Sequence, residues 1–182
     1  LLILILILIV VIDKENPLFR QVRIGYKKRK FHIIKFRTMS SKIKIVSKET
    51  LGVNDPRITS LGKILRKTKL DELPQLFNIF FGNMSFVGPR PEIPYYAENY
   101  NLNEQIVFQV KPGLTDLATL ELINIDKRFD KREIESPEEF YRDKIQPLKK
   151  GMQIKYIHKM SFWEDLKIIL LTSWYIIKRK NG

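Results

Sequence analysis

Cysteine is absent from this chain of 182 residues, and histidine occurs only as His32 and His158. The absence of cysteine excludes disulfides, thiolate zinc sites and a cysteine nucleophile. Two histidines so far apart in the sequence do not predict a histidine-rich metal site.

Acidic residues are also scarce. The chain has 20 Asp and Glu against 33 Lys and Arg, which gives a formal net charge of +13. This imbalance indicates an anionic partner, such as lipid headgroups, phosphates or nucleic acid, and does not by itself choose among them. Hydrophobic residues make up 44% of the chain, enough for one folded domain with its own core.

The longest apolar run lies at the start, where Leu1 to Ile12 contains no polar residue. A bilayer-spanning helix needs about 20 such residues, and a helix of 12 residues is only about 18 Å long. The basic start and small-residue cleavage site of a signal peptide are not seen. We interpret this run as the end of a membrane helix in a polypeptide that extends further at its N-terminus. The alternatives are a re-entrant segment or a buried strand.

The remaining pattern predicts a mixed α/β domain, mostly helical with a small β-hairpin. The predicted strands are Leu18–Ile24 and Phe31–Met39, and the predicted helices are 59–67, 71–81, 101–110 and 161–180. Loops or turns are expected at 40–51, 83–91 and 111–115, and a solvent-exposed helix and loop at 126–150.

Lys35 and Arg37 could bind a phosphate, because they alternate along one strand and should point to the same face. The alternative is that this face is simply solvated.

Asp71 falls at or near a predicted helix N-cap, followed by Glu72. Both carboxylates could serve only the helix terminus, as a cap and a dipole partner. Arg90 lies in a rigid loop between Pro89 and Pro91.

The C-terminal segment from Ser161 to Lys180 carries Phe162, Trp163, Leu166, Ile169, Leu170, Trp174 and Ile177 at helical spacing. An amphipathic helix with Trp and a basic end is typical of a membrane interface. Packing against the protein core is the alternative.

Three motifs in order resemble the bacterial sugar transferases, the monotopic phosphoglycosyl transferases. They are Lys35-Phe36-Arg37-Thr38-Met39, Leu70-Asp71-Glu72-Leu73-Pro74-Gln75-Leu76 and Ser85-Phe86-Val87-Gly88-Pro89-Arg90-Pro91. Asp55-Pro56-Arg57-Ile58-Thr59, Lys111-Pro112-Gly113-Leu114-Thr115 and Ser161-Phe162-Trp163-Glu164-Asp165-Leu166-Lys167 fit the same pattern. The resemblance therefore covers nearly the whole chain.

The resemblance implies that Asp71 attacks the sugar-bearing phosphate of a nucleoside diphosphate sugar, with a UDP-sugar as the family default. The phospho-sugar then passes from Asp71 to polyprenyl (undecaprenyl) phosphate. It also implies Mg²⁺ as cofactor, held by Glu72 with Asp71, although Glu72 could instead transfer a proton. Lys35, Arg37, Arg66 and Arg90 are the expected phosphate contacts.

The family further implies a monotopic protein on the cytoplasmic face of the bacterial inner membrane. Residues 1–12 would be the end of a re-entrant helix, and residues 13–182 the sugar transferase domain. The expected partners are a nucleotide-sugar, polyprenyl phosphate and membrane lipid, with no nucleic acid. The expected pathways are capsule, exopolysaccharide, O-antigen (lipopolysaccharide) or glycoprotein glycan synthesis.

The chain departs from the family pattern after the Pro-Gly-Leu-Thr turn. Asp116 to Asn124 replaces an element that usually ends in Arg. Arg128, Arg132 or Arg142 could substitute for this Arg in space.

Two other functions compete with this prediction. A conventional glycosyltransferase would release nucleoside diphosphate, but a Gly-rich Rossmann turn and an Asp-x-Asp pair are both missing from the sequence. A non-catalytic basic membrane-surface module would explain the charge but not the Asp71-Glu72 pair.

Overall fold

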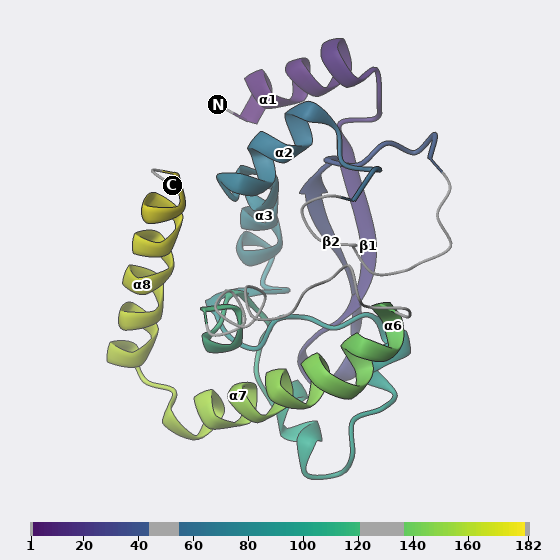
Figure 1. Cartoon of the computed structure of the whole chain (residues 1–182). Coiled ribbons are helices and arrows are strands. Elements are labelled where there is room, and N and C mark those ends of the chain that lie inside the picture. Colours follow the sequence, from purple (N-terminus) through teal and green to yellow (C-terminus); the bar gives the residue numbers. More distant parts are fainter. Residues whose placement is uncertain (1, 44–54, 121–136, 181–182) are drawn as a thin grey trace.

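The structure is a computed structural model that describes residues 2–43, 55–120 and 137–180. It confirms the predicted mixed, mostly helical class with a small hairpin (Figure 1). The α-helices are α1 (Leu2–Leu8), α2 (Ser60–Lys67), α3 (Gln75–Phe80), α4 (Pro94–Ala97), α6 (Pro137–Phe140), α7 (Gln146–Lys159) and α8 (Phe162–Lys180). The strands are β1 (Leu18–Ile24), β2 (Lys30–Phe36), β3 (Ser85–Val87) and β4 (Gly113–Thr115). Short 3-10 helices cover Tyr26–Lys28, Leu70–Glu72 and Glu104–Gln109, and π-type turns cover Ile9–Asp13 and Tyr141–Ile145.

The antiparallel hairpin pairs β1 with β2 from Leu18↔Phe36 to Ile24↔Lys30. The second strand ends three residues before the predicted Met39. Beyond Phe36 the chain leaves the hairpin to bond the segment that precedes α2: Thr59 N donates to Thr38 O at 3.1 Å, and Met39 bridges Ile58.

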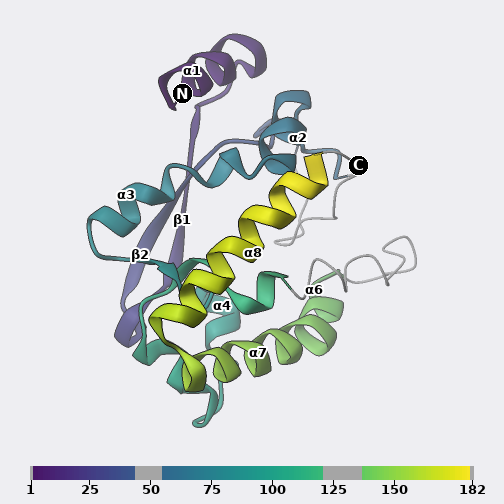
Figure 2. The same cartoon turned by 90° about the vertical axis from the view of Figure 1, so that its left-hand side faces the viewer.

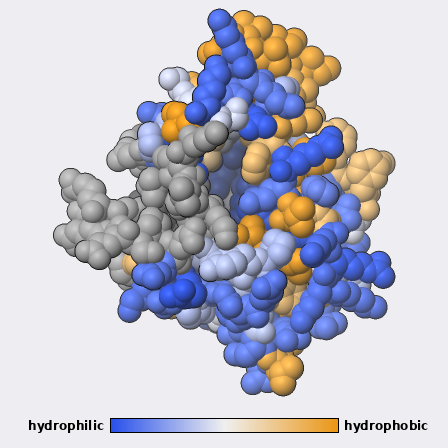
Figure 3. Space-filling view, turned by 90° about the vertical axis from the view of Figure 1, so that its right-hand side faces the viewer, coloured by the Kyte–Doolittle hydropathy of each residue, from blue (hydrophilic) through white to orange (hydrophobic). Residues whose placement is uncertain are grey.

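Helix α1 stands at one end of the hairpin (Figure 1). Its Ile5, together with Ile9 of the following turn, packs against Phe36 of β2 and Leu65 of α2. Ile3, Leu4 and Ile7 of α1 are exposed, and apolar surface gathers at this end of the molecule (orange, top of Figure 3). In the described part of the chain, no helix is both long and apolar enough to cross a bilayer. Insertion of residues 1–12 into one leaflet stays a prediction.

A second, parallel sheet joins β3 to β4, with Ser85 opposite Gly113 and Val87 opposite Thr115. The prediction of irregular structure at 83–91 and 111–115 is wrong for these residues. Each strand has only three residues, too few for a periodic signal. The two segments of the chain approach so closely that a Cβ on Gly113 would lie 2.2 Å from Gly88 N. This sheet places Arg90 beside residues 114–116.

Helix α3 buries polar residues and exposes apolar ones. Its buried residues are Gln75 and Asn78, whereas Phe77, Phe80 and Phe81 are 50%, 82% and 71% exposed. Asn78 anchors the helix to β2, because its Oδ1 accepts from Ile34 N at 3.1 Å and its Nδ2 donates to His32 O at 2.8 Å. Gly82, at φ +78°, follows the helix end and adopts the left-handed conformation that favours glycine.

Helix α7 also buries polar residues. The predicted solvent exposure of 126–150 is wrong for Lys149 and Lys150, which are buried. Lys149 Nζ lies 2.7 Å from Glu92 Oε2, and Lys150 Nζ lies 2.8 Å from Glu104 Oε2. Their burial is possible because each ammonium has an acidic partner. The helix predicted at 101–110 is the shorter 3-10 helix Glu104–Gln109.

Helix α8 confirms the predicted C-terminal helix and runs along one side of the molecule (Figure 2). It packs through Ile168, which is buried with Val87, Leu120 and Tyr156. The predicted apolar set faces outward instead: Phe162, Trp163, Leu166, Ile169, Leu170, Trp174 and Ile177 are all exposed. Core packing therefore does not account for these seven side chains.

Candidate active site

Asp71 and Glu72 lie on the 3-10 turn Leu70–Glu72 between α2 and α3, and both are buried. Lys69, at φ 59°, begins this turn in the left-handed conformation. The predicted N-cap role of Asp71 is wrong, because α3 begins at Gln75, follows Pro74 and has no side-chain cap. The carboxylate of Asp71 is thus not committed to a helix terminus.

Glu72 is held by two cations from distant parts of the chain. Its Oε1 lies 2.9 Å from Lys35 Nζ of β2 and also accepts a short bond from Arg90. Its Oε2 lies 3.4 Å from the second terminal nitrogen of Arg90, which also faces Leu114 O at 3.4 Å. Burial would raise the pKa of Glu72, but Arg90 and Lys35 hold this pKa well below its ordinary value. Glu72 is therefore an anion at neutral pH.

Asp71 has a different environment. It is 8% exposed, and its Oδ1 has no hydrogen-bond partner among the described residues. Burial raises the pKa of Asp71, and the negative charge of Glu72 raises it further. Lys35, Lys69 and Arg66 oppose this rise. A desolvated carboxylate with a free oxygen is a stronger nucleophile than a hydrated or hydrogen-bonded one.

Lys35 responds to the same burial. Desolvation lowers the pKa of its ammonium group to about 8, although Glu72 works in the opposite direction. The Arg90 guanidinium lies beside Glu72, which raises the pKa of Arg90. The site therefore contains one permanent cation and one cation that loses its proton at mildly alkaline pH.

The other two predicted cations are placed differently. Arg66 of α2 donates from Nε to Thr38 Oγ1 at 2.7 Å. Burial lowers the pKa of Arg66 and its attraction to Asp71 raises it, so this side chain belongs to the site's electrostatic field. Arg37 does not join the group: its guanidinium donates to the backbone oxygens of Asn16 at 2.6 Å and Leu18 at 3.3 Å. The chain leaves the strand after Phe36, so the predicted alternation no longer applies.

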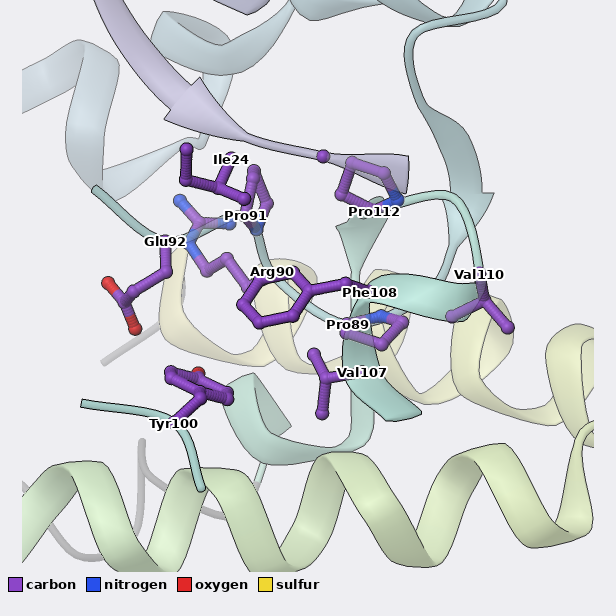
Figure 4. A pocket seen from close by; sticks show the side chains of 11 residues that line it. Ile24, Pro89, Arg90, Pro91, Glu92, Tyr100, Val107, Phe108, Val110 and Pro112 are labelled. Atoms are coloured by element: carbon purple, nitrogen blue, oxygen red, sulfur yellow. The ribbon is translucent and has the colours of Figure 1, made fainter. Parts of the chain in front are cut away.

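Arg90 is positioned by residues that the motifs did not identify. Asp116 Oδ2 accepts from Arg90 N at 3.3 Å, and Gln153 Nε2 of α7 donates to Arg90 O at 3.3 Å. Behind this segment lies a small pocket, in which Pro89 and Pro91 meet the apolar side chains of Tyr100, Val107 and Phe108 (Figure 4). The sequence offered one signal, the acidic residue directly after the Pro-Gly-Leu-Thr turn.

Of the three proposed substitutes for the family arginine, the structure describes only Arg142. Arg128 and Arg132 lie outside the described residues. Arg142 is on the π-type turn before α7, where its Nε lies 2.8 Å from Asp143 Oδ1 on an exposed surface.

The carboxylates of Asp71 and Glu72 are the candidate ligands for magnesium. In the described ranges, no cluster of three or more His, Cys, Asp and Glu side chains could hold a metal. Magnesium, however, usually binds one or two carboxylates together with substrate phosphates and water. The unpartnered oxygen of Asp71 fits such a ligand set, whereas both oxygens of Glu72 already face cations. The donor set is thus suited to a metal that arrives with a phosphate.

The site thus combines a buried carboxylate that has an unpartnered oxygen with cations of the kind that bind phosphate. A family model described as bacterial sugar transferase matches residues 1–179. The chain belongs to this family.

Curated relatives agree with this assignment. The galactosyl transferase CpsE of Streptococcus agalactiae is 35% identical over 88% of this chain and 34% of its own length. The UDP-galactose-lipid carrier transferase of Erwinia amylovora is 35% identical over 98% of this chain and 37% of its own length. A UDP-glucose:undecaprenyl-phosphate glucose-1-phosphate transferase of Caulobacter vibrioides is 36% identical over 98% of this chain and 64% of its own length. The chain spans about a third of the first two relatives.

Proposed function

We propose that the chain is the catalytic domain of a phosphoglycosyl transferase that moves a sugar 1-phosphate from a UDP-sugar to undecaprenyl phosphate. The observation that carries this proposal is the unpartnered, buried Oδ1 of Asp71, next to a glutamate held by Lys35 and Arg90. The names of the relatives supply the substrate classes, a UDP-sugar and a lipid carrier.

The reaction proceeds in two displacements. Asp71 Oδ1 attacks the sugar-bearing β-phosphorus, the bond from this phosphorus to the bridging oxygen breaks, and UMP leaves with that oxygen. The phospho-sugar is now an acyl phosphate on Asp71. A phosphate oxygen of undecaprenyl phosphate attacks the same phosphorus, and the Asp71 carboxylate leaves unchanged. Covalent catalysis of this kind divides one difficult transfer between two anions into two easier steps.

The cations offset the repulsion between an anionic nucleophile and an anionic diphosphate. Lys35 and Arg90 are fixed by Glu72 before substrate arrives, so no reorganisation is needed when charge develops on the phosphoryl oxygens. Glu72 acts in this scheme as the residue that orients both cations. Arg66 adds a partly buried positive charge near Asp71.

A magnesium ion would be held by the carboxylates of Asp71 and Glu72 together with substrate phosphate oxygens. When bound, it would supply charge neutralisation at the diphosphate. The residues of the chain then perform the rest: they position the phosphorus, supply the nucleophile and bind the developing charge.

The same proposal places the domain on the cytoplasmic face of the bacterial inner membrane. The exposed apolar residues of α1, α3 and α8 support it, together with the net charge of +13, because anionic lipid attracts basic proteins. A non-catalytic membrane module would share these surfaces but would not need the buried site.

Nucleotide release tests the function directly. Protein in detergent is supplied with magnesium, undecaprenyl phosphate and either UDP-glucose or UDP-galactose, and the released nucleotide is quantified. We expect UMP from at least one sugar, and a loss of at least about 1,000-fold in Asp71→Asn, because this change keeps the size but removes the nucleophile. UDP as product would identify a conventional glycosyltransferase, and normal UMP release by Asp71→Asn would exclude Asp71 as the nucleophile.

A further inference from the structure

Gln75 is the first residue of α3 and is fully buried, at 0% exposure. In the described part of the chain, neither Oε1 nor Nε2 of its side chain has a hydrogen-bond partner. An unpaired buried polar group destabilises a protein, because the loss of its hydrogen bonds to water is not offset. Gln75 keeps both ends of its carboxamide unpaired in the interior, which calls for a functional explanation.

The position of Gln75 relative to Asp71 supplies one. The buried residues of this stretch are Asp71, Glu72, Pro74, Gln75 and Asn78, which at helical spacing share one broad face. Leu73 and Pro74, which connect the turn to α3, are both in the right-handed helical conformation. Long side chains on a helix lean toward the preceding turn, so the carboxamide of Gln75 is directed toward the turn that carries Asp71. Asp71, whose Oδ1 is unpartnered, is one of these buried residues and precedes Gln75 by four positions.

Asn78, on the same face, shows the contrast. Its amide is fully used, because it bonds both Ile34 N and His32 O of β2. Asn78 therefore has a structural role that explains its burial. Gln75, one turn closer to Asp71, has none of these bonds.

We propose that Gln75 is a further catalytic residue, whose amide Nε2 donates a hydrogen bond to a non-bridging oxygen of the phosphoryl group while that group is attached to or attacked by Asp71. The proposal rests on the function proposed above. A neutral donor suits this place, because a further cation in direct contact with Asp71 would pair with the carboxylate and weaken it as a nucleophile. The bond strengthens as charge builds up on the phosphoryl oxygens.

The test compares wild type with Gln75→Met, which preserves the length of the side chain but removes both polar atoms. We expect a kcat for UMP release that is about 10- to 100-fold lower, with KM for the UDP-sugar changed less than about threefold. The melting temperature should stay equal or rise, because the variant removes two unpaired polar atoms from the interior. A purely structural residue would show the opposite, lower stability together with lower activity.

Gln75→Glu provides a second measurement. A carboxylate directed at Asp71 raises its pKa further, so the acid limb of the pH–rate profile should move to higher pH. Gln109→Met is the matched control, since Gln109 is exposed at the end of the 3-10 helix Glu104–Gln109, and it should match wild type in every measurement.

Two outcomes would overturn the inference: full kcat in Gln75→Met, which would leave an ordered water as the partner of Gln75, or joint loss of stability and activity. Asp71→Asn is assayed in parallel, so that failure of the proposed function is recognised separately. If wild type releases no UMP, the proposed function itself is rejected, and the inference about Gln75 falls with it.

Discussion

Asp71 and Glu72 are adjacent in the sequence, yet the fold gives their carboxylates opposite environments. Both are buried, which opposes ionisation in each. Glu72 forms ion pairs with Lys35 and Arg90, whereas Oδ1 of Asp71 has no hydrogen-bond partner among the described residues and the pKa of Asp71 is raised. Separating the pKa values of two neighbouring acids is how enzymes assign them different tasks. The motif identifies the pair, but only the packing of β2 and the Arg90 loop decides which of the two carboxylates is paired with cations.

The pKa shifts predict a bell-shaped dependence of kcat/KM on pH. Activity should fall on the acid side as Asp71 takes up a proton, at a pH above the ordinary Asp value of 3.8, because its pKa is raised. On the alkaline side, Lys35 is protonated below its pKa of about 8 and loses its charge above it, so activity should decline as pH rises through about 8.

Lys35→Arg is the variant that checks the alkaline limb. Guanidinium stays protonated throughout this range, so the decline near pH 8 should disappear while the acid limb remains. The measurement is kcat/KM for UMP release between pH 5 and 10. Full activity of wild type up to pH 10 would show that the charge of Lys35 is not required.

Sequence patterns located the cations of the site with mixed accuracy. Lys35 and Arg90 meet at Glu72, and Arg66 interacts with Asp71. Arg37 binds backbone oxygens instead, because the strand ends one residue before it. Gln75 and Gln153 had no signal of their own, since an uncharged amide in a helix looks the same in sequence whether it faces water or the core.

At the scale of elements, periodicity located α2, α3 and α8 but did not tell which side of α3 and α8 is buried. The apolar face of α3 is exposed and its polar face is buried, and the apolar set of α8 faces outward as well. Hydrophobic spacing marks a face that avoids water, and lipid satisfies this requirement as well as a protein core does. The parallel pair β3–β4 was missed because its two strands of three residues lie 28 residues apart in sequence.

Helix α7 connects the core to the site, and this gives a prediction for Gln153. Gln153→Met removes the donor to Arg90 O, so we expect about a tenfold lower kcat/KM together with a loss of about 1–2 kcal/mol in unfolding free energy. Gln146→Met is the matched control, because Gln146 lies on the same buried face but donates to Tyr96 O at 3.0 Å.

Urea denaturation and UMP release are measured on both variants. Gln146→Met should lose similar stability but keep its activity. Equal loss of activity in the two variants would mean that α7 supports the fold in general and not Arg90 in particular.

At the scale of the whole molecule, apolar exposure is concentrated on α1, α3 and α8, while α7 lies at the end of the molecule opposite α1 (Figure 1). Phe80 and Phe81 are among the most exposed large side chains. This distribution predicts a membrane-facing side that includes α3, close to the Asp71 turn, so that a lipid-borne acceptor could reach the nucleophile without leaving the bilayer surface.

Replacing Phe80 and Phe81 together by Ser should weaken binding to vesicles that contain anionic lipid by at least about tenfold. Leu102→Ser is the control, because Leu102 is 86% exposed and precedes the 3-10 helix that packs on α7, away from α1. Co-sedimentation measures both. Unchanged binding of the double variant, or an equal loss in Leu102→Ser, would remove α3 from the membrane-facing side.

The polar buried face of α7 also restricts how the sequence can change over time. Each buried polar residue of α7 has a specific partner; these residues are Gln146, Lys149, Lys150 and Gln153. Sliding the helix by one turn would therefore leave buried ammonium groups without their acidic partners. An apolar face would tolerate such slippage far better. Substitutions on α7 should therefore be accepted mainly in pairs, with Lys149 and Glu92 changing together. The register of α7 is locked, and with it the placement of Arg90.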